Sequence, residues 1–270
     1  MTWGQFTQWL TEQLSQRDNG INEARWLVEA LTGLPFYTLR EQPFEAELRP
    51  KFEAAVTELA QGRPFQYVIG SQEFFGLTFH VREGVLVPRP ETELLTEVAI
   101  QWGRGRNIDA LDLCTGSGCI AITLSKRLQG TFTAVDLSSE ALTIAKENND
   151  LLGASVDFRQ GDLFSPVIGE TFDLITANPP YLSEKEMSQI PVELTYEPSL
   201  ALVSGRDGLD LCRLIINEVN GYLRDGGLFL MEFGETQGLS ILKLMKPLGW
   251  HTVEIRKDYN GKDRFLYAIK

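Results

Sequence analysis

The stretch IDALDLCTGSGCIAI, residues 108–122, decides the fold class of this chain. It begins as an apolar, strand-like segment, continues through two glycines, Gly116 and Gly118, and becomes helix-like from Ile120. Glycine permits a tight turn and lets a backbone approach a ligand closely. The stretch therefore predicts a strand, a loop and a helix whose N-terminus faces a ligand.

Strands and helices alternate on the C-terminal side of this stretch. Strands are predicted over residues 108–114, 132–136, 156–159, 172–177, 228–233, 253–256 and 264–269. Such alternation indicates an α/β protein with a doubly wound, mostly parallel seven-stranded sheet. Asn260-Gly261 is a hairpin signal that demands an antiparallel last strand. A sheet of this kind resembles the class I S-adenosylmethionine-dependent methyltransferase fold.

The chain before this sheet has a different pattern. Residues 1–64 carry apolar stripes at helical spacing, which predict a small helical domain whose aromatic side chains pack its own core. Between residues 65 and 90 apolar residues alternate, and Gly84 precedes Val85, Leu86 and Val87, so a β-hairpin linker is expected. The methyltransferase-like domain would then span residues 91–270.

The composition excludes several classes of protein. The 270 residues include 25 Lys and Arg against 37 Asp and Glu, a net charge of −12 that argues against general polyanion binding. Cys114, Cys119 and Cys212 are odd in number and form no Cys-x-x-Cys pair, so neither a disulfide framework nor a metal site is expected. Without a long apolar run or a secretory signal pattern, the expected location is cytoplasmic.

The first chemical motif is the glycine loop together with Asp136, which ends the next strand about 20 residues later. A carboxylate at this place can accept hydrogen bonds from both hydroxyls of a ribose. The third glycine of a dinucleotide-binding motif is replaced by Ala121, which disfavours a dehydrogenase. A nucleoside without pyrophosphate, such as S-adenosylmethionine, fits better. Asp162, after the third strand, could accept from the adenine amino group or be an ordinary loop residue.

The second motif is Asn178-Pro179-Pro180-Tyr181, directly after the strand 172–177. The motif therefore lies at the carboxyl edge of the sheet, where α/β folds bind ligands. The Asn178 side-chain oxygen and the Pro179 carbonyl can each accept one N–H of a planar NH2 group, with Pro180 keeping the backbone rigid. Tyr181 is expected to form an aromatic wall beside this group.

With these motifs in place, the chain resembles the HemK or PrmC family, the peptide chain release factor N5-glutamine methyltransferases. The family's order of motifs is matched by residues 62–67, 88–93, 112–122, 178–181 and 197–198. The resemblance implies that the protein substrate is the glutamine of the Gly-Gly-Gln loop of class 1 release factors. It further implies that the S-adenosylmethionine site is lined by Cys114, Thr115, Gly116, Ser117, Gly118, Asp136, Leu163 and Asn178, to which the position of Asp162 after the third strand adds a further candidate.

Other residues near the motifs have assigned or open roles. The resemblance places Arg89 near the substrate, and Glu197 is a second candidate for substrate contact. Many relatives have glycine where this chain has Cys114, and the backbone there is expected to be extended. Catalysis is assigned to Asn178, Pro179, Pro180 and Tyr181, which hold the amide so that its nitrogen attacks the methyl group without a strong base.

Four other functions stay open. The tetrapeptide also fits a ribosomal-protein glutamine methyltransferase or an adenine-N6 DNA methyltransferase, although the latter needs a basic groove. A dehydrogenase and a non-catalytic binding module are less compatible with residues 178–181. The protein is expected to act as a monomer, without direct contact to nucleic acid or membrane.

Overall fold

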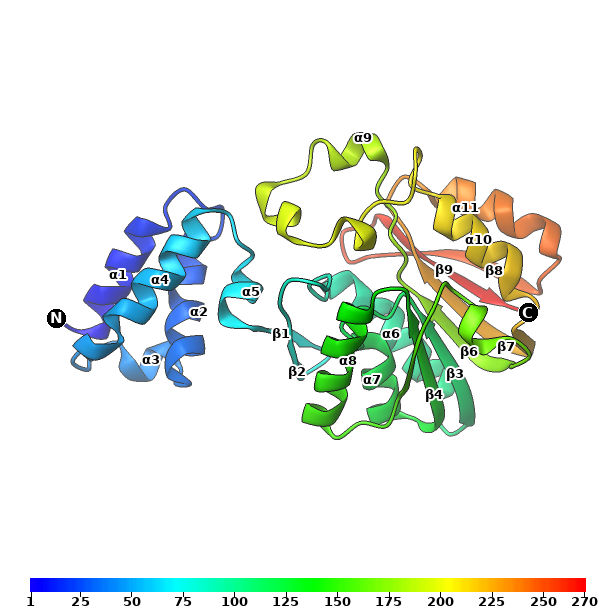
Figure 1. Cartoon of the computed structure of the whole chain (residues 1–270), viewed down its shortest axis with the longest axis horizontal. Helices are drawn as coiled ribbons and strands as arrows, with labels where there is room; N and C mark the ends of the chain where they lie inside the picture. The colour runs from blue at the N-terminus through cyan, green and yellow to red at the C-terminus, as the bar shows by residue number, and fades with distance from the viewer. The chain divides into compact units, whose positions relative to one another are not determined.

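The computed structural model describes all residues from Met1 to Lys270, which form two compact units (Figure 1). The first unit contains Met1–Ser71 and the short segment Pro191–Tyr196, and the second contains Gln72–Ile190 and Glu197–Lys270. The segment 191–196 thus packs with residues far from it in sequence. Tyr196 donates a hydrogen bond to the carbonyl of Gln61 over 3.1 Å, and its neighbour Val192 lies against Gly62.

The first unit is helical, as its apolar stripes predict. Helix α1 begins after Thr2, whose side chain accepts from the N–H of Gln5 in a capping box. Trp3, Phe6 and Leu10 then fall on one buried face of α1. The helices are α1 (Trp3–Gln13), α2 (Gly20–Thr32), α3 (Phe36–Leu39), η1 (Ala46–Leu48), α4 (Arg49–Ala60), α5 (Phe65–Ile69) and η3 (Val192–Tyr196).

The second unit is built on a seven-stranded sheet of order β5-β4-β3-β6-β7-β9-β8. Its strands are β3 (Asn107–Leu113), β4 (Gln129–Asp136), β5 (Asp157–Gln160), β6 (Phe172–Ala177), β7 (Leu223–Glu232), β8 (Thr252–Lys257) and β9 (Asp263–Ile269). All strands run in one direction except β9, which pairs antiparallel with both β7 and β8. The mostly parallel sheet with an antiparallel last strand is therefore confirmed.

Helices cover both faces of this sheet (Figure 1). Strand β7 contributes Leu228 and Leu230 to the core beneath α6 and α7, and Phe229 and Met231 to the core beneath α10 and α11. This alternation follows from the two-residue period of a strand. The helices are α6 (Pro90–Gly103), α7 (Cys119–Arg127), α8 (Ser139–Leu152), α9 (Glu184–Met187), α10 (Asp210–Val219) and α11 (Gly238–Met245), with 3-10 turns η2 (Ser165–Val167), η4 (Ser199–Ala201) and η5 (Lys246–Leu248).

The segment between residues 65 and 90 differs in part from the sequence prediction. The expected hairpin is present as β1 (Ser71–Phe74) and β2 (Leu77–His80). However, Phe65–Ile69 is helix α5, which buries Phe65 in the core of the first unit. Residues 85–87 form no strand, so the strand-like pattern after Gly84 does not extend the hairpin.

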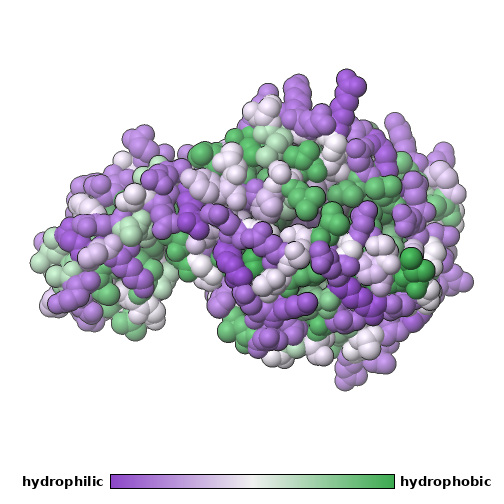
Figure 2. Space-filling model, viewed as in Figure 1, coloured by the Kyte–Doolittle hydropathy of each residue, from purple (hydrophilic) through white to green (hydrophobic).

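The surface carries both polar and apolar residues. On the face shown in Figure 2, hydrophobic residues are interspersed with hydrophilic ones. No helix has the length and the apolar composition that crossing a bilayer requires.

We expect Phe6→Ala to destabilise the first unit by about 3–5 kcal/mol, the usual cost of deleting a buried aromatic ring. Phe6 is fully buried and stacks on Phe44 at a ring distance of 3.9 Å. Amide hydrogen exchange should accelerate in α1, α2 and α4 and stay unchanged in β3 and β6, which belong to separate cores. The matched control is Tyr37→Ala, since Tyr37 is 81% exposed. Equal protection in both variants would contradict this account of the core.

Candidate active site

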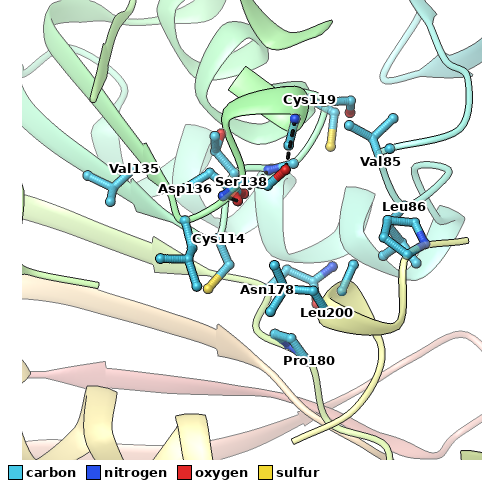
Figure 3. Close-up of a pocket in the computed structure, with 18 of the residues that line it drawn as sticks. Val85, Leu86, Cys114, Cys119, Val135, Asp136, Ser138, Asn178, Pro180 and Leu200 are labelled. Atoms are coloured by element: carbon cyan, nitrogen blue, oxygen red, sulfur yellow. Dashed lines mark hydrogen bonds between the residues drawn. The ribbon is translucent and has the colours of Figure 1, made fainter. Parts of the chain in front are cut away.

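A cavity opens in the second unit at the carboxyl ends of β3, β4 and β6. It holds about 150 Å³ of space and is lined by parts of the segments 84–92, 114–120, 135–141, 161–163, 178–180 and 198–201, together with Leu211. Parallel strands bring their carboxyl ends to one edge of a sheet, so the motifs after each strand meet there. In the view of Figure 3, Cys114 lies between Asp136 and Asn178.

The loop between β3 and α7 turns through three residues with left-handed backbone. Gly116 has a φ of 55° and Gly118 a φ of 81°, and in both cases the missing Cβ makes this conformation accessible. Cys114 has a φ of 56°, so the expectation of an extended backbone at this position is wrong. A left-handed conformation favours glycine, so Cys114 adopts a backbone that is costly for a residue with a Cβ atom.

The buried carboxyl group of Asp112, in strand β3, holds the loop by hydrogen bonds. Asp112 accepts from the hydroxyl of Thr115 over 2.6 Å and from the hydroxyl of Thr176 over 2.7 Å. Burial raises the pKa of Asp112 to about 7, although both hydroxyls oppose this shift. Asp112 thereby connects the end of β3 to the loop and to β6.

Asp136 lies at the end of β4 and faces the same loop. Its Oδ2 accepts from the N–H of Gly116 over 2.8 Å, and its Oδ1 accepts from the N–H of Ser138 over 2.9 Å. Burial raises the pKa of Asp136, and these two N–H groups oppose the shift. Each carboxylate oxygen has a second lone pair, so Asp136 can accept further hydrogen bonds from a ligand.

The remaining predicted cofactor residues are grouped around the same space. Thr115, Ser117, Asp162 and Leu163 line the cavity along with Cys114, Gly116, Asp136 and Asn178. Gly118 begins α7 directly behind the loop and does not line the cavity. The structure thus brings together the residues that the sequence singled out on four separate segments.

The tetrapeptide 178–181 divides between the cavity and the interior. Asn178 and Pro180 line the cavity, whereas Pro179 and Tyr181 do not. The hydroxyl of Tyr181 donates to Oε1 of Glu232 over 3.2 Å, and the Tyr181 carbonyl accepts from Gln237 over 2.9 Å. Tyr181 is therefore anchored inward at the end of β7, and its role as an aromatic wall stays a prediction.

The two candidates for substrate contact bind one another. The same guanidinium nitrogen of Arg89, Nη2, donates to both carboxylate oxygens of Glu197 over 2.7 and 2.8 Å. Burial raises the pKa of Glu197, and the charge of Arg89 opposes this shift. Arg89 lines the cavity, as does Pro198, the neighbour of Glu197. The pair thus fixes one wall of the cavity.

Three buried polar residues in the site were missed at the level of sequence. Asn148 in α8 donates to the carbonyls of His80 and Ser117, both over 3.0 Å, and accepts from the N–H of His80 over 2.7 Å. Thr92 accepts from the Asn178 side chain and donates to Glu232. One sequence signal could have identified Glu232, namely an acidic residue at the end of an apolar strand.

The comparisons with known proteins cover both units. The family model described as "PrmC N-terminal domain" matches residues 5–70, and the "Methyltransferase small domain" model matches residues 91–205. The release factor glutamine methyltransferase of Bacillus subtilis (strain 168) is 36% identical over 97% of this chain and 96% of that protein. The chain belongs to the release factor glutamine methyltransferase family. Its S-adenosylmethionine-dependent methyltransferase fold is confirmed.

Other relatives and structures agree with this membership. The release factor glutamine methyltransferase of Geobacter sulfurreducens is 36% identical over 96% of this chain and 93% of its own length. The fold is shared with a methyltransferase from Pyrococcus furiosus, at a TM-score of 0.57, 19% identity, and coverage of 84% of this chain and 99% of that one. It is also shared with a chain of the E. cuniculi Mtq2-Trm112 complex, at a TM-score of 0.52, 19% identity, and coverage of 69% of this chain and 99% of that one.

The cavity of this methyltransferase suits the charge and the hydroxyl groups of S-adenosylmethionine. Its lining includes the carboxylates Asp136, Glu140 and Asp162, whereas its only basic residue, Arg89, is paired with Glu197. An excess of negative charge favours a sulfonium cation. The left-handed loop exposes backbone where a nucleoside can approach closely, and Asp136 retains acceptor capacity for hydroxyl groups.

We expect Asp136→Ala to weaken S-adenosylmethionine binding by about 1.5–3 kcal/mol, because charge-assisted hydrogen bonds to the ribose are lost. Isothermal calorimetry on the full chain measures this change. Asp150→Ala is the control, since Asp150 is an exposed residue of α8. Unchanged affinity in Asp136→Ala would remove this carboxylate from the cofactor site.

Proposed function

We propose that this methyltransferase transfers the methyl group of S-adenosylmethionine to the N5 side-chain nitrogen of the glutamine in the Gly-Gly-Gln motif of class 1 peptide chain release factors. Such a modification would modulate translation termination. Membership of the family over nearly the whole chain supports this substrate. The E. cuniculi complex, whose title names methylation of the termination factor eRF1, has the same fold.

The observation that carries the proposal is that the glycine loop and the tetrapeptide share one cavity. Gly116 of the glycine loop and Asp136 at the end of β4 line this cavity. Asn178 and Pro180, which follow β6 in the chain, line it as well. A methyl donor held by the loop and an amide held by Asn178 would therefore be close enough to react. Proximity of this kind supplies a large part of the rate enhancement in group transfer.

The chemical difficulty is the weak nucleophilicity of an amide nitrogen, whose lone pair is delocalised into the carbonyl. S-adenosylmethionine, when bound, would supply an electrophilic methyl group on its sulfonium, and breaking the S–CH3 bond would leave S-adenosylhomocysteine as the product. The Oδ1 atom of Asn178 would accept one N–H group of the glutamine. The carbonyl of Pro179, which follows Asn178 but does not line the cavity, would accept the other once the substrate is bound. Holding both N–H groups favours a tetrahedral nitrogen and leaves its lone pair aimed at the methyl group.

The proton leaves after the new C–N bond has begun to form, because methylation makes the nitrogen more acidic. Asn178 Oδ1 or water can receive this proton, so no strong general base is required. Electrostatic preorganisation by Asn178 is then the main contribution of this part of the chain.

Two alternative substrates use the same acceptors, namely a ribosomal-protein glutamine and the exocyclic amine of adenine in DNA. The net charge of −12 disfavours the DNA substrate, which needs basic contacts to phosphates. Mass spectrometry distinguishes them after incubation with labelled S-adenosylmethionine and, in parallel, a release factor, ribosomal protein and adenine-containing DNA. Label on the Gly-Gly-Gln glutamine alone is expected.

We expect Asn178→Ala to lower the single-turnover methylation rate of a release factor about 100- to 1,000-fold, the usual effect of losing one preorganised hydrogen bond. S-adenosylmethionine affinity should change little, because the glycine loop and Asp136 are untouched. Asn217→Ala, at an exposed position of α10 in the second unit, is the matched control. A wild-type rate in Asn178→Ala would rule out the proposed orientation of the glutamine.

We further propose that the helical unit is a docking domain for the release factor and that the protein acts as a monomer without direct nucleic-acid contact. The cofactor and acceptor motifs all belong to the second unit, so the first unit is available for recognition.

We expect a chain beginning near Glu73 to bind S-adenosylmethionine and to methylate a short Gly-Gly-Gln peptide at the full-length rate. On an intact release factor, kcat/KM should fall at least about tenfold, because docking contacts contribute binding energy. The peptide serves as the internal control for folding of the second unit. Equal turnover on the intact factor would show that residues 1–72 are not needed for recognition.

A further inference from the structure

A chain of three side chains runs from the interior to the cavity. Glu232, at the end of β7, accepts on Oε2 from the hydroxyl of Thr92 over 2.7 Å. The Oγ1 atom of the same Thr92 accepts from Nδ2 of Asn178 over 3.2 Å. Glu232 and Thr92 are buried, and Thr92 lies in the first turn of α6, far from both partners in sequence.

The direction of these hydrogen bonds follows from the carboxylate of Glu232. An ionised carboxylate can only accept, so Thr92 must use its single hydroxyl hydrogen toward Glu232. Thr92 then has only lone pairs to offer Asn178, which must turn its NH2 group toward Thr92. The remaining polar atom of Asn178, the acceptor Oδ1, is the one left for a ligand.

We propose that Glu232 and Thr92 are positioning residues that fix the side-chain amide of Asn178 with its oxygen toward the substrate. The proposal rests on the methyl transfer to a glutamine NH2 inferred above. Without this chain, the Asn178 amide could rotate by half a turn and present its own NH2, which cannot accept from a glutamine NH2. The buried pair thereby favours a substrate amide over a substrate carboxylate.

Other groups hold Glu232 in place and charged. The Tyr181 hydroxyl donates to its second oxygen, and the positive charge of Arg264, which pairs with Asp258 over 3.0 Å, favours the ionised form. Burial raises the pKa of Glu232 to about 6, with the Thr92 hydroxyl and Arg264 opposing the shift and the charge of Glu91 adding to it. At pH 8 the carboxylate is therefore ionised.

A double-mutant cycle tests whether Thr92 acts through Asn178. Thr92→Val keeps the shape of the side chain and removes its hydroxyl. At pH 8, it should lower the single-turnover rate on a release factor about 10- to 100-fold in the wild-type background. In the Asn178→Ala background, the same change should alter the rate less than about twofold, since no amide remains to be oriented.

Further variants separate positioning from folding. Thr92→Ser keeps the hydroxyl and should recover the rate lost in Thr92→Val to within about threefold of wild type. Glu232→Met replaces the carboxylate with an apolar side chain of similar size. It should likewise lower the single-turnover rate when Asn178 is present and change it little in the Asn178→Ala background. Thr143→Val, at an exposed position of α8, is the matched control. Melting temperature and calorimetric S-adenosylmethionine affinity are measured for every variant.

The outcomes distinguish the two proposals. The positioning role of Thr92 would be overturned if Thr92→Val lowered the rate equally in the wild-type and Asn178→Ala backgrounds. A wild-type rate in Thr92→Val would overturn it too. Failure of Thr92→Ser to recover the rate would also overturn it. If the wild-type protein does not methylate the release factor, or Asn178→Ala is fully active, the proposed function itself fails. Strong coupling between Thr92 and Asn178 in the double-mutant cycle supports both the positioning role and the proposed function.

Discussion

The left-handed turn after β3 is the constraint on which the rest of the site depends. Residues 114, 116 and 118 all have positive φ, so the chain reverses sharply between the strand and α7 and leaves space at the sheet edge. Asp112 holds this turn from the interior, and Asp136 holds it from the neighbouring strand. A straighter connection would fill the space that the cavity occupies.

Buried polar side chains connect elements that are distant in sequence. Asp112 joins β3 to β6, and Glu232 joins β7 to α6 and to the residues after β6. Such groups are costly to bury unless their hydrogen bonds are satisfied, and each of these has at least two partners. The same groups that fix the geometry of the sheet edge therefore also orient the side chains of the site.

The parts of the fold with strong local periodicity could be predicted from the sequence. The strands, the helices and the antiparallel end of the sheet follow from apolar spacing, glycines and the Asn260-Gly261 turn. Residues 65–69 were predicted wrongly, because a short apolar run fits a helix or a strand equally well and tertiary packing decides between them. Residues 85–87 form neither, because no strand lies beside them to pair with this apolar run.

The site was predictable where a motif occupies consecutive residues, and was not where partners are brought together by the fold. The pairing of Arg89 with Glu197 and the contact of Thr92 with Asn178 span 108 and 86 residues. No local sequence pattern predicts contacts between residues that are so far apart in the chain. The backbone of Cys114 was misjudged for a related reason, since a cysteine gives no sign that its position requires positive φ.

The hydrogen bonds of Asn148 have an evolutionary consequence. Its side chain binds the backbone of His80 and Ser117, not their side chains. Positions 80 and 117 can therefore drift to other residues without loss of these bonds, whereas position 148 needs both a donor and an acceptor on a short stem. Aspartate lacks the donor and glutamine is one methylene too long. As far as these hydrogen bonds are concerned, selection should thus act on position 148 and not on the side chains at positions 80 and 117.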